Sequence, residues 1–173
     1  PCQPPPGYYP PPPHPGDGPP DITCQIPPKN GFGNVWNNNY HLRQRIGCPT
    51  EQEVGLNAFE QQFKNAYVVD SRTDMQIYVL FNNGYWEKRP NTWQQGDAVT
   101  NPMLIPPHGW YQPEYGIGKM WRNDDNFSQR TGWAKWPQQP VQATRQTYEH
   151  GEMLWTGTRG VFTLFPDGSW VHN

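Results

Sequence analysis

Short apolar segments separated by turn residues recur in two stretches of the chain, and their spacing predicts β-strands. They are short and contain β-branched and aromatic residues, and turn residues bound them, as is typical of strands. In the first stretch we expect strands over 56–63, 66–69, 77–81 and 85–88. In the second we expect strands over 141–148, 153–156, 161–165 and 169–172. Clusters of Asn, Asp and Gly lie between the segments, as hairpin turns require.

A short segment with helical character precedes each set of strands. We expect helices over 40–45 and 127–130, because Gly47 and Gly132 stand where a helix C-terminal glycine belongs. The Gly-x-Gly sequences further upstream, at 31–33 and 116–118, are interpreted as turns that lead into a tryptophan. The expected fold class is therefore mainly β, with two small tandem β-meanders that each carry one short helix.

The two stretches also match in sequence, which indicates an internal repeat. Residues 31–36 match 116–121, residues 44–47 match 129–132, and residues 77–81 match 161–165. The chain is accordingly divided into four parts: an extended arm (1–28), a first repeat (29–88), a Pro/Gly/Trp-rich linker (89–115) and a second repeat (116–173). Four short strands alone are barely stable, so the repeats are expected to pack together.

The N-terminal arm holds more than half of the 22 prolines, so we expect an extended polyproline II conformation. Its candidate anchors are Tyr8, Tyr9, Ile22 and Ile26. Such a segment keeps one conformation only when something holds it. Either the globular part of the same chain or a neighbouring copy can do this, and the working hypothesis is the neighbouring copy.

Nine tryptophans stand out in a chain of 173 residues. Four occupy matching positions in the two repeats and are the expected core anchors, because each buries a large area: Trp36, Trp86, Trp121 and Trp170. The duplicated core does not explain the other five, which are Trp93, Trp110, Trp133, Trp136 and Trp155. Aromatic plates among amide side chains suit a sugar-binding face. They also suit a subunit interface or a thin core filled by large side chains, and these three explanations stay open.

Charge and hydropathy narrow the classes of partner. The formal net charge is −2 and only 16% of residues are charged, whereas nucleic-acid-binding domains present a basic surface. No nucleic-acid partner is therefore expected. The chain has no apolar run near the roughly 20 residues of a membrane helix, so no membrane span is expected. An aromatic content of 14% argues against a wholly disordered chain.

Three cysteines, Cys2, Cys24 and Cys48, lie in the first third of the chain. Their spacing fits neither a zinc site nor a redox pair. An odd number in a secreted protein suggests one disulfide with a leftover thiol, or a bond between chains. We expect Cys24–Cys48 inside the chain, with Cys2 free or bridging to a neighbour, while Cys2–Cys48 and a fully reduced state remain alternatives.

No metal or cofactor is expected. The five histidines have no ligand spacing among themselves or with the cysteines. Asp124 and Asp125 are oxygen donors of the kind that Ca²⁺ uses, but a helix-capping role is preferred, because Asn37, Asn38 and Asn39 stand in their place in the first repeat. Asn126 begins an Asn-x-Ser sequence and is a candidate glycosylation acceptor.

Catalytic residues are not expected either. A glycoside hydrolase needs two carboxylates on either side of a cleft. The available carboxylates do not recur at matching positions in the two repeats: Glu51, Glu53, Glu60, Asp70, Asp74, Glu149 and Glu152. No nucleophile motif such as Gly-x-Ser-x-Gly is present.

Three segments carry a family resemblance: RIGCPTEQEVG, QIYVLFNNGYW and GIGKMWRNDDNFSQRTGWA. They resemble an uncharacterised aromatic-rich repeat of secreted and cell-surface bacterial proteins, loosely similar to the LGFP repeats of cell-wall proteins. The resemblance covers residues 26–88 and 105–173 and implies an extracellular location with a binding or structural role. The first repeat departs from the pattern at two places. It has Cys48 where the second repeat has Trp133, and it has Asn65-Ala66 where the second repeat has His150-Gly151.

The leading functional hypothesis is a non-enzymatic, secreted structural protein that forms an extracellular filament or a cell-surface assembly. In it, the arm of one copy packs on the next copy. The alternative is a module that binds glycans such as cell-wall polysaccharide, and the second alternative is a hydrolase.

Overall fold

The computed structural model describes residues 22–173, which form eight strands and four short helices. The helices are α1 (Asn30–Asn38), α2 (Tyr40–Ile46), α3 (Tyr115–Asn123) and α4 (Asp125–Thr131). The strands are β1 (Val54–Gln62), β2 (Ala66–Ser71), β3 (Gln76–Phe81), β4 (Trp86–Pro90), β5 (Gln139–Tyr148), β6 (Gly151–Thr156), β7 (Gly160–Leu164) and β8 (Trp170–His172). The expected mainly β fold is confirmed. In this part of the chain no helix has the length and apolarity needed to cross a membrane.

All eight strands belong to one antiparallel sheet in the order β4-β3-β2-β1-β5-β6-β7-β8. The two expected meanders are thus continuous with each other, because β1 pairs with β5 along most of its length. The outer strands then approach each other at one end. There Trp86 N donates to Gly168 O at 2.8 Å, and Trp170 N donates to Gly84 O at 3.0 Å. The sheet is therefore a nearly closed barrel.

The barrel interior is the first of three apolar cores. Side chains alternate between the two faces of each strand, and the inward set fills the barrel: Leu56, Ala58, Tyr67, Val69, Tyr78, Leu80, Val141, Ala143, Leu154, Phe162 and Leu164. Trp86 and Trp170 pack against this cluster while remaining partly exposed. The indole N–H of Trp86 donates to Phe165 O at 2.8 Å and so ties β4 to the residue just after β7. The indole N–H of Trp170 donates to Phe81 O at 3.0 Å and so ties β8 to the end of β3.

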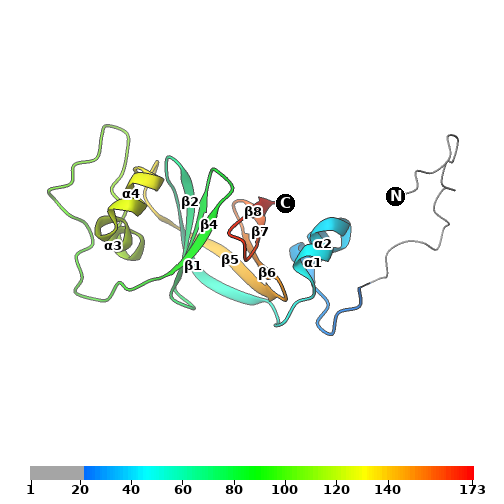
Figure 1. Ribbon diagram of the computed structural model, residues 1–173. Coiled ribbons are helices and arrows are strands. Elements are labelled where there is room, and N and C mark those ends of the chain that lie inside the picture. The colour runs from blue at the N-terminus through cyan, green and yellow to red at the C-terminus, as the bar shows by residue number, and fades with distance from the viewer. Residues whose placement is uncertain (1–21) are drawn as a thin grey trace, which may run out of the picture.

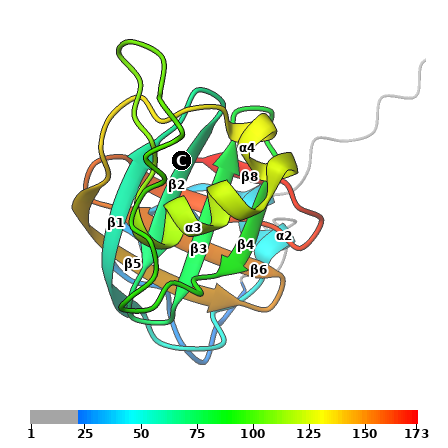
Figure 2. The same ribbon diagram turned by 90° about the vertical axis from the view of Figure 1, so that its left-hand side faces the viewer.

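Two further cores lie between the outer face of the sheet and the helices, which cover it from opposite sides (Figures 1 and 2). Trp121 of α3 and Phe127 of α4 pack with Val68 and Val79 of β2 and β3. On the other side, Phe32, Trp36, Leu42 and Ile46 of α1 and α2 pack with Met153 and Val161 of β6 and β7.

Each helix pair therefore covers the strands of the other sequence stretch. The helices that precede β1–β4 pack on β6 and β7, and the helices that precede β5–β8 pack on β2 and β3. The predicted boundaries at 88 and 116 follow the order of the sequence and do not separate two compact bodies.

The Gly-x-Gly segments differ from expectation, because they lie inside α1 and α3 and are not turns. Their second glycine is needed for close packing. A Cβ at Gly33 would lie 2.7 Å from Pro28 O, and one at Gly118 would lie 2.3 Å from Pro113 O. The expected helices α2 and α4 are present, and they end at Gly47 and Gly132 with φ of 77° and 70°, as a C-terminal glycine does.

Candidate functional site

A pocket of about 280 Å³ lies where the first turn of α1 meets the outer face of β5 and β6. This volume is close to the lower end of the range for small-molecule sites, ~300 Å³. The lining combines apolar and polar side chains: Asn30, Gly31, Phe32, Glu53, Thr144 and Trp155. The pocket therefore has the mixed character of a ligand site.

Trp155 forms the apolar wall of this pocket. Its neighbour Leu154 points into the barrel core, so strand alternation turns Trp155 to the outer face, where it pairs with Thr144 across β6 and β5. Trp155 Cδ1 would lie 3.8 Å from a Cβ at Gly31. The indole is half-buried, with its apolar body against Phe32 and the α1 core.

Asn30 and Glu53 form the polar wall. Asn30 Nδ2 donates to Glu53 Oε2 at 3.2 Å, while Glu53 Oε1 is buried and has no hydrogen-bond partner among residues 22–173. Asn30 also has a φ of 48°, the left-handed region that Asn tolerates better than most residues. The pocket thus combines a flat indole, a hydroxyl, an amide and a carboxylate that has one oxygen unpaired within the described residues.

The other expected surface tryptophans do not share this pocket. Trp133 packs on Trp121 with ring centroids 4.8 Å apart, and Trp93 packs edge-on against Tyr115 at 5.2 Å. Trp110 is half-buried, and Trp136 is exposed. Of the five, the structure thus places Trp155 alone in the pocket at α1.

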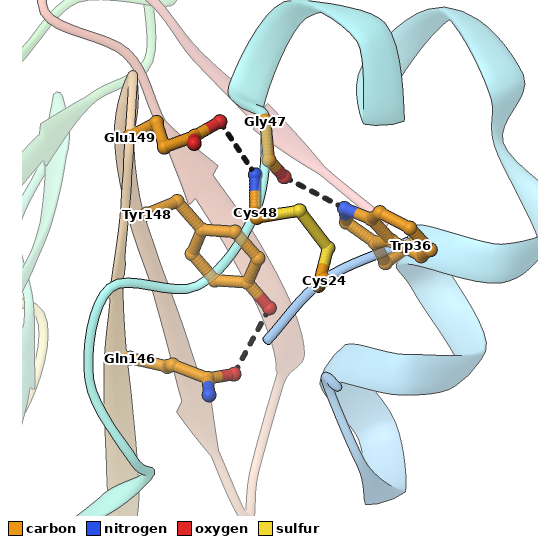
Figure 3. Close-up of a disulfide and its surroundings, with 7 residues drawn as sticks. All are labelled: Cys24, Trp36, Gly47, Cys48, Gln146, Tyr148 and Glu149. Atoms are coloured by element: carbon orange, nitrogen blue, oxygen red, sulfur yellow. Dashed lines mark hydrogen bonds between the residues drawn. A yellow bond between two sulfur atoms is a disulfide. The ribbon is translucent and has the colours of Figure 1, made fainter. Parts of the chain in front are cut away.

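The expected Cys24–Cys48 disulfide is confirmed. It joins the segment before α1 to the residue after Gly47 (Figure 3). Around it, Trp36 Nε1 donates to Gly47 O at 2.8 Å, and Cys48 N donates to Glu149 Oε2 at 3.0 Å. The bond therefore holds the end of the arm beside the core formed by α1, α2, β6 and β7. Disulfides persist in oxidising compartments, which is consistent with a secreted protein.

The described end of the arm packs on its own chain. Ile22 contacts the core beneath α1 and α2, and Ile26 lies with Cys48 and Glu149 along a surface groove. Binding to a neighbouring copy is thus not needed to hold Ile22, contrary to the expectation for this anchor. Tyr8, Tyr9 and Cys2 lie outside the described residues.

Removal of the disulfide is expected to lower the free energy of unfolding by about 3 kcal/mol, because it closes a loop of 24 residues in the unfolded chain. The measurement is urea unfolding of the C24A/C48A double variant against the unsubstituted chain. C2A serves as the control and should unfold at the unsubstituted midpoint. A double variant as stable as the parent would contradict the prediction.

Carboxylates around the barrel core are held in ion pairs and hydrogen bonds. Tyr78 OH donates to Glu152 Oε1 at 2.8 Å, and Lys88 Nζ contacts Glu152 Oε2 at 2.7 Å. Arg145 Nε contacts Asp74 Oδ2 at 3.1 Å. These carboxylates are neutralised by cations and do not line the pocket.

A second cluster surrounds Glu60, which accepts hydrogen bonds from Tyr67 and Thr158 at 2.5 Å and from Gln139 at 2.9 Å. Burial, reinforced by the hydrogen bond to Glu60, raises the pKa of Tyr67. Burial likewise raises the pKa of Tyr78, with a further contribution from the charge of Glu152. Both phenols are thus held in the protonated form.

The acidic turn before α4 caps the helix, as expected. Asp124 Oδ1 accepts from Phe127 N at 3.0 Å, and Oδ2 accepts from Arg89 Nη1 at 2.6 Å. The bond from the Phe127 backbone lowers the pKa of Asp124 most, and the bond from Arg89 lowers it further. Asn39 caps α2 in the same way, through Leu42 N at 3.0 Å. Among residues 22–173 no group of three His, Cys, Asp or Glu side chains is placed to hold a metal. The glycosylation candidate Asn126 is exposed on α4.

Sequence reasoning found Trp155 but missed Asn30, Thr144 and, as a pocket residue, Glu53. These side chains come from α1, the segment before β1, and β5, and only the crossed packing of helices and strands brings them together. No local pattern records that arrangement. No protein-family model, curated protein or solved structure matches the chain.

Proposed function

We propose that this protein is an extracellular glycan-binding module and that the pocket beside Trp155 contacts the sugar. The observation that carries the proposal is the half-buried indole of Trp155 facing Asn30, Glu53 and Thr144 around one pocket. The role proposed is binding without catalysis, since Glu152 and Asp74 near the barrel core are engaged in ion pairs.

The chemistry of a sugar matches this lining. A pyranose has a flat C–H face that packs on an aromatic ring, and hydroxyl groups around its edge that need donors and acceptors. Trp155 supplies the ring, Asn30 and Thr144 supply both donors and acceptors, and Glu53 supplies acceptors. Few polar groups around an apolar wall are typical of a site that fixes the orientation of its ligand.

Binding is expected to depend on Trp155. In affinity electrophoresis through gels containing cell-wall polysaccharide, the affinity of W155A should fall about tenfold or more. A tenfold loss corresponds to about 1.4 kcal/mol of binding free energy. W136A is the matched control, because Trp136 is exposed and lies outside the pocket. T144V tests the polar edge with little change in shape. Circular dichroism shows that each variant folds, and retained binding by folded W155A would defeat the proposal.

A second candidate, self-assembly, is favoured by a different surface. The segment between β4 and α3 extends beyond the helices in Figure 1, and it exposes 85% of Met103 and 83% of Ile105. Exposed apolar side chains of this size mark interaction surfaces when they lie together. A second copy of the chain is the partner in this hypothesis.

The assembly hypothesis predicts that M103S/I105S lowers the average mass measured by sedimentation over a range of concentrations. M75S is the control, because Met75 is an exposed apolar side chain in the turn between β2 and β3. Deletion of residues 1–21 shows whether the arm contributes while Cys24 is kept. An unsubstituted chain that is monomeric at high concentration would exclude this candidate.

A further inference from the structure

The pocket beside Trp155 has a counterpart on the opposite side of the molecule, and there the chain fills it. Gly31 and Gly116 are the second residues of α1 and α3. A Cβ at Gly31 would make only ordinary contacts, 3.6 Å from Val161 Cγ2 and 3.8 Å from Trp155 Cδ1, so no group of the chain occupies its position. A Cβ at Gly116 would lie 2.3 Å from both Nδ2 and Oδ1 of Asn91. A carboxamide group therefore occupies the second pocket.

The carboxamide of Asn91 is bound through both of its polar atoms. Its Nδ2 donates to Asp70 Oδ1 at 2.7 Å, and its Oδ1 accepts from Trp93 N at 3.0 Å. Only 5% of Asn91 is exposed. The counterpart thus shows what this kind of pocket holds: a planar amide that packs flat on a helical glycine and donates its N–H to a carboxylate.

The open pocket keeps this shape with different walls. Trp155 pairs with Thr144 on β6 and β5 as Asp70 pairs with Phe59 on β2 and β1, so an indole stands in place of the carboxylate. The carboxylate is supplied from another position, by Glu53, which directly precedes β1. Its Oε1 is buried without a partner in the described chain, and an unpaired buried acceptor is unfavourable.

An amide ligand for this pocket needs an N–H for Glu53 and an apolar part for Trp155. An asparagine side chain has the first but ends in a second polar group. An acetamido group has both, since its N–H is a donor and its methyl group is apolar. When the acetamido group is attached to a pyranose, the adjoining ring can also pack on the indole.

We infer that the open pocket recognises the acetamido group of an N-acetylated sugar, with the N–H donating to Glu53 and the methyl group against Trp155. This inference rests on the proposed glycan-binding function and names the class of sugar. The recognition is expected at a single sugar unit, given the pocket volume of about 280 Å³.

The test compares two tetrasaccharides that differ only at carbon 2 of each ring: the β-1,4-linked tetramers of N-acetylglucosamine and of glucose. By isothermal titration calorimetry the acetylated tetramer should bind about tenfold or more tightly, as expected for one hydrogen bond to a charged group. Equal affinities would overturn the inference and leave the proposed function standing. Failure of both sugars to bind would overturn both.

Two further measurements address the named atoms. E53Q should weaken binding of the acetylated tetramer about tenfold, whereas Q138A, which alters the residue directly before β5 as Glu53 directly precedes β1, should leave the affinity unchanged. In saturation-transfer NMR with the unsubstituted protein, the acetamido methyl should receive the strongest saturation. Strongest transfer to another part of the sugar would overturn the inference even if E53Q failed to fold.

Discussion

Residues 22–91 expressed alone are expected to give no folded monomer. This segment contains α1, α2 and β1–β4, and thus the whole of the first predicted repeat. Its helices, however, pack on β6 and β7, and its strands β2 and β3 are covered by α3 and α4. Separated from the rest, the segment exposes the apolar faces of both its helices and its strands.

The expected loss is complete because no core remains whole. Ile77 and Val79 lose Ile117, Trp121 and Phe127 as partners, and the barrel interior loses all of its residues from β5–β7. A domain of this size is marginal even with an intact core. The segment should therefore be unfolded, or should dimerise so that each copy covers the strands of the other.

Near-UV circular dichroism and sedimentation of residues 22–91 provide the measurement. Addition of residues 92–173 in equal amount should restore the near-UV spectrum of the full chain, which serves as the control. A monomeric segment that unfolds cooperatively on its own would show that the contacts between the halves are dispensable.

Alkaline pH is expected to unfold the protein steeply. Burial is the main cause that raises the pKa of Tyr67, Tyr78 and Tyr148, with smaller contributions from nearby Glu60, Glu152 and Glu53. In the unfolded chain these phenols lose their protons near pH 10. Stability is therefore complete below pH ~9 and falls as the pH rises above 10, because only the unfolded state then releases protons.

The slope follows from the number of phenols involved. Each contributes about 1.4 kcal/mol per pH unit, so the three together should cost up to about 4 kcal/mol between pH 10 and pH 11. Urea unfolding at a series of pH values measures this slope. Y148F should reduce it by about a third, and Y111F, which removes an exposed phenol, should leave it unchanged. A free energy of unfolding independent of pH up to 11 would contradict the prediction.

The strands were predictable from sequence, since every expected strand lies within two residues of an observed one. A short run of β-branched and aromatic residues such as Ile77–Phe81 is a local signal, and turn residues such as Gly84, with φ of 84°, mark where the strands end. The helices α1 and α3 were missed because their glycines argue against a helix in isolation. The second glycine of each segment, Gly33 or Gly118, is required by the close approach of Pro28 or Pro113, just outside the helix.

The way the parts combine was not predictable in the same manner. Whether a helix pair packs on its own stretch or on the other depends on which apolar face meets which strand. Trp36 and Trp121 are large apolar side chains that suit both arrangements, so the residue types alone do not decide between them. The pocket followed from packing on the other stretch, since it brings Asn30 of α1 to Trp155 of β6. Sequence matching between the two stretches thus predicted the strands but not which helices pack on them.

The outer strands of the barrel have a consequence for how copies of this chain can meet. Amyloid-like growth and strand exchange need a free strand edge with unpaired backbone groups. Here β8 has only three residues, and β4 reads Trp86, Glu87, Lys88, Arg89, Pro90, so charge and a missing N–H discourage a further strand. Any contact between copies through the described residues should therefore be made by side chains, and concentrated solutions should resist conversion to fibrils.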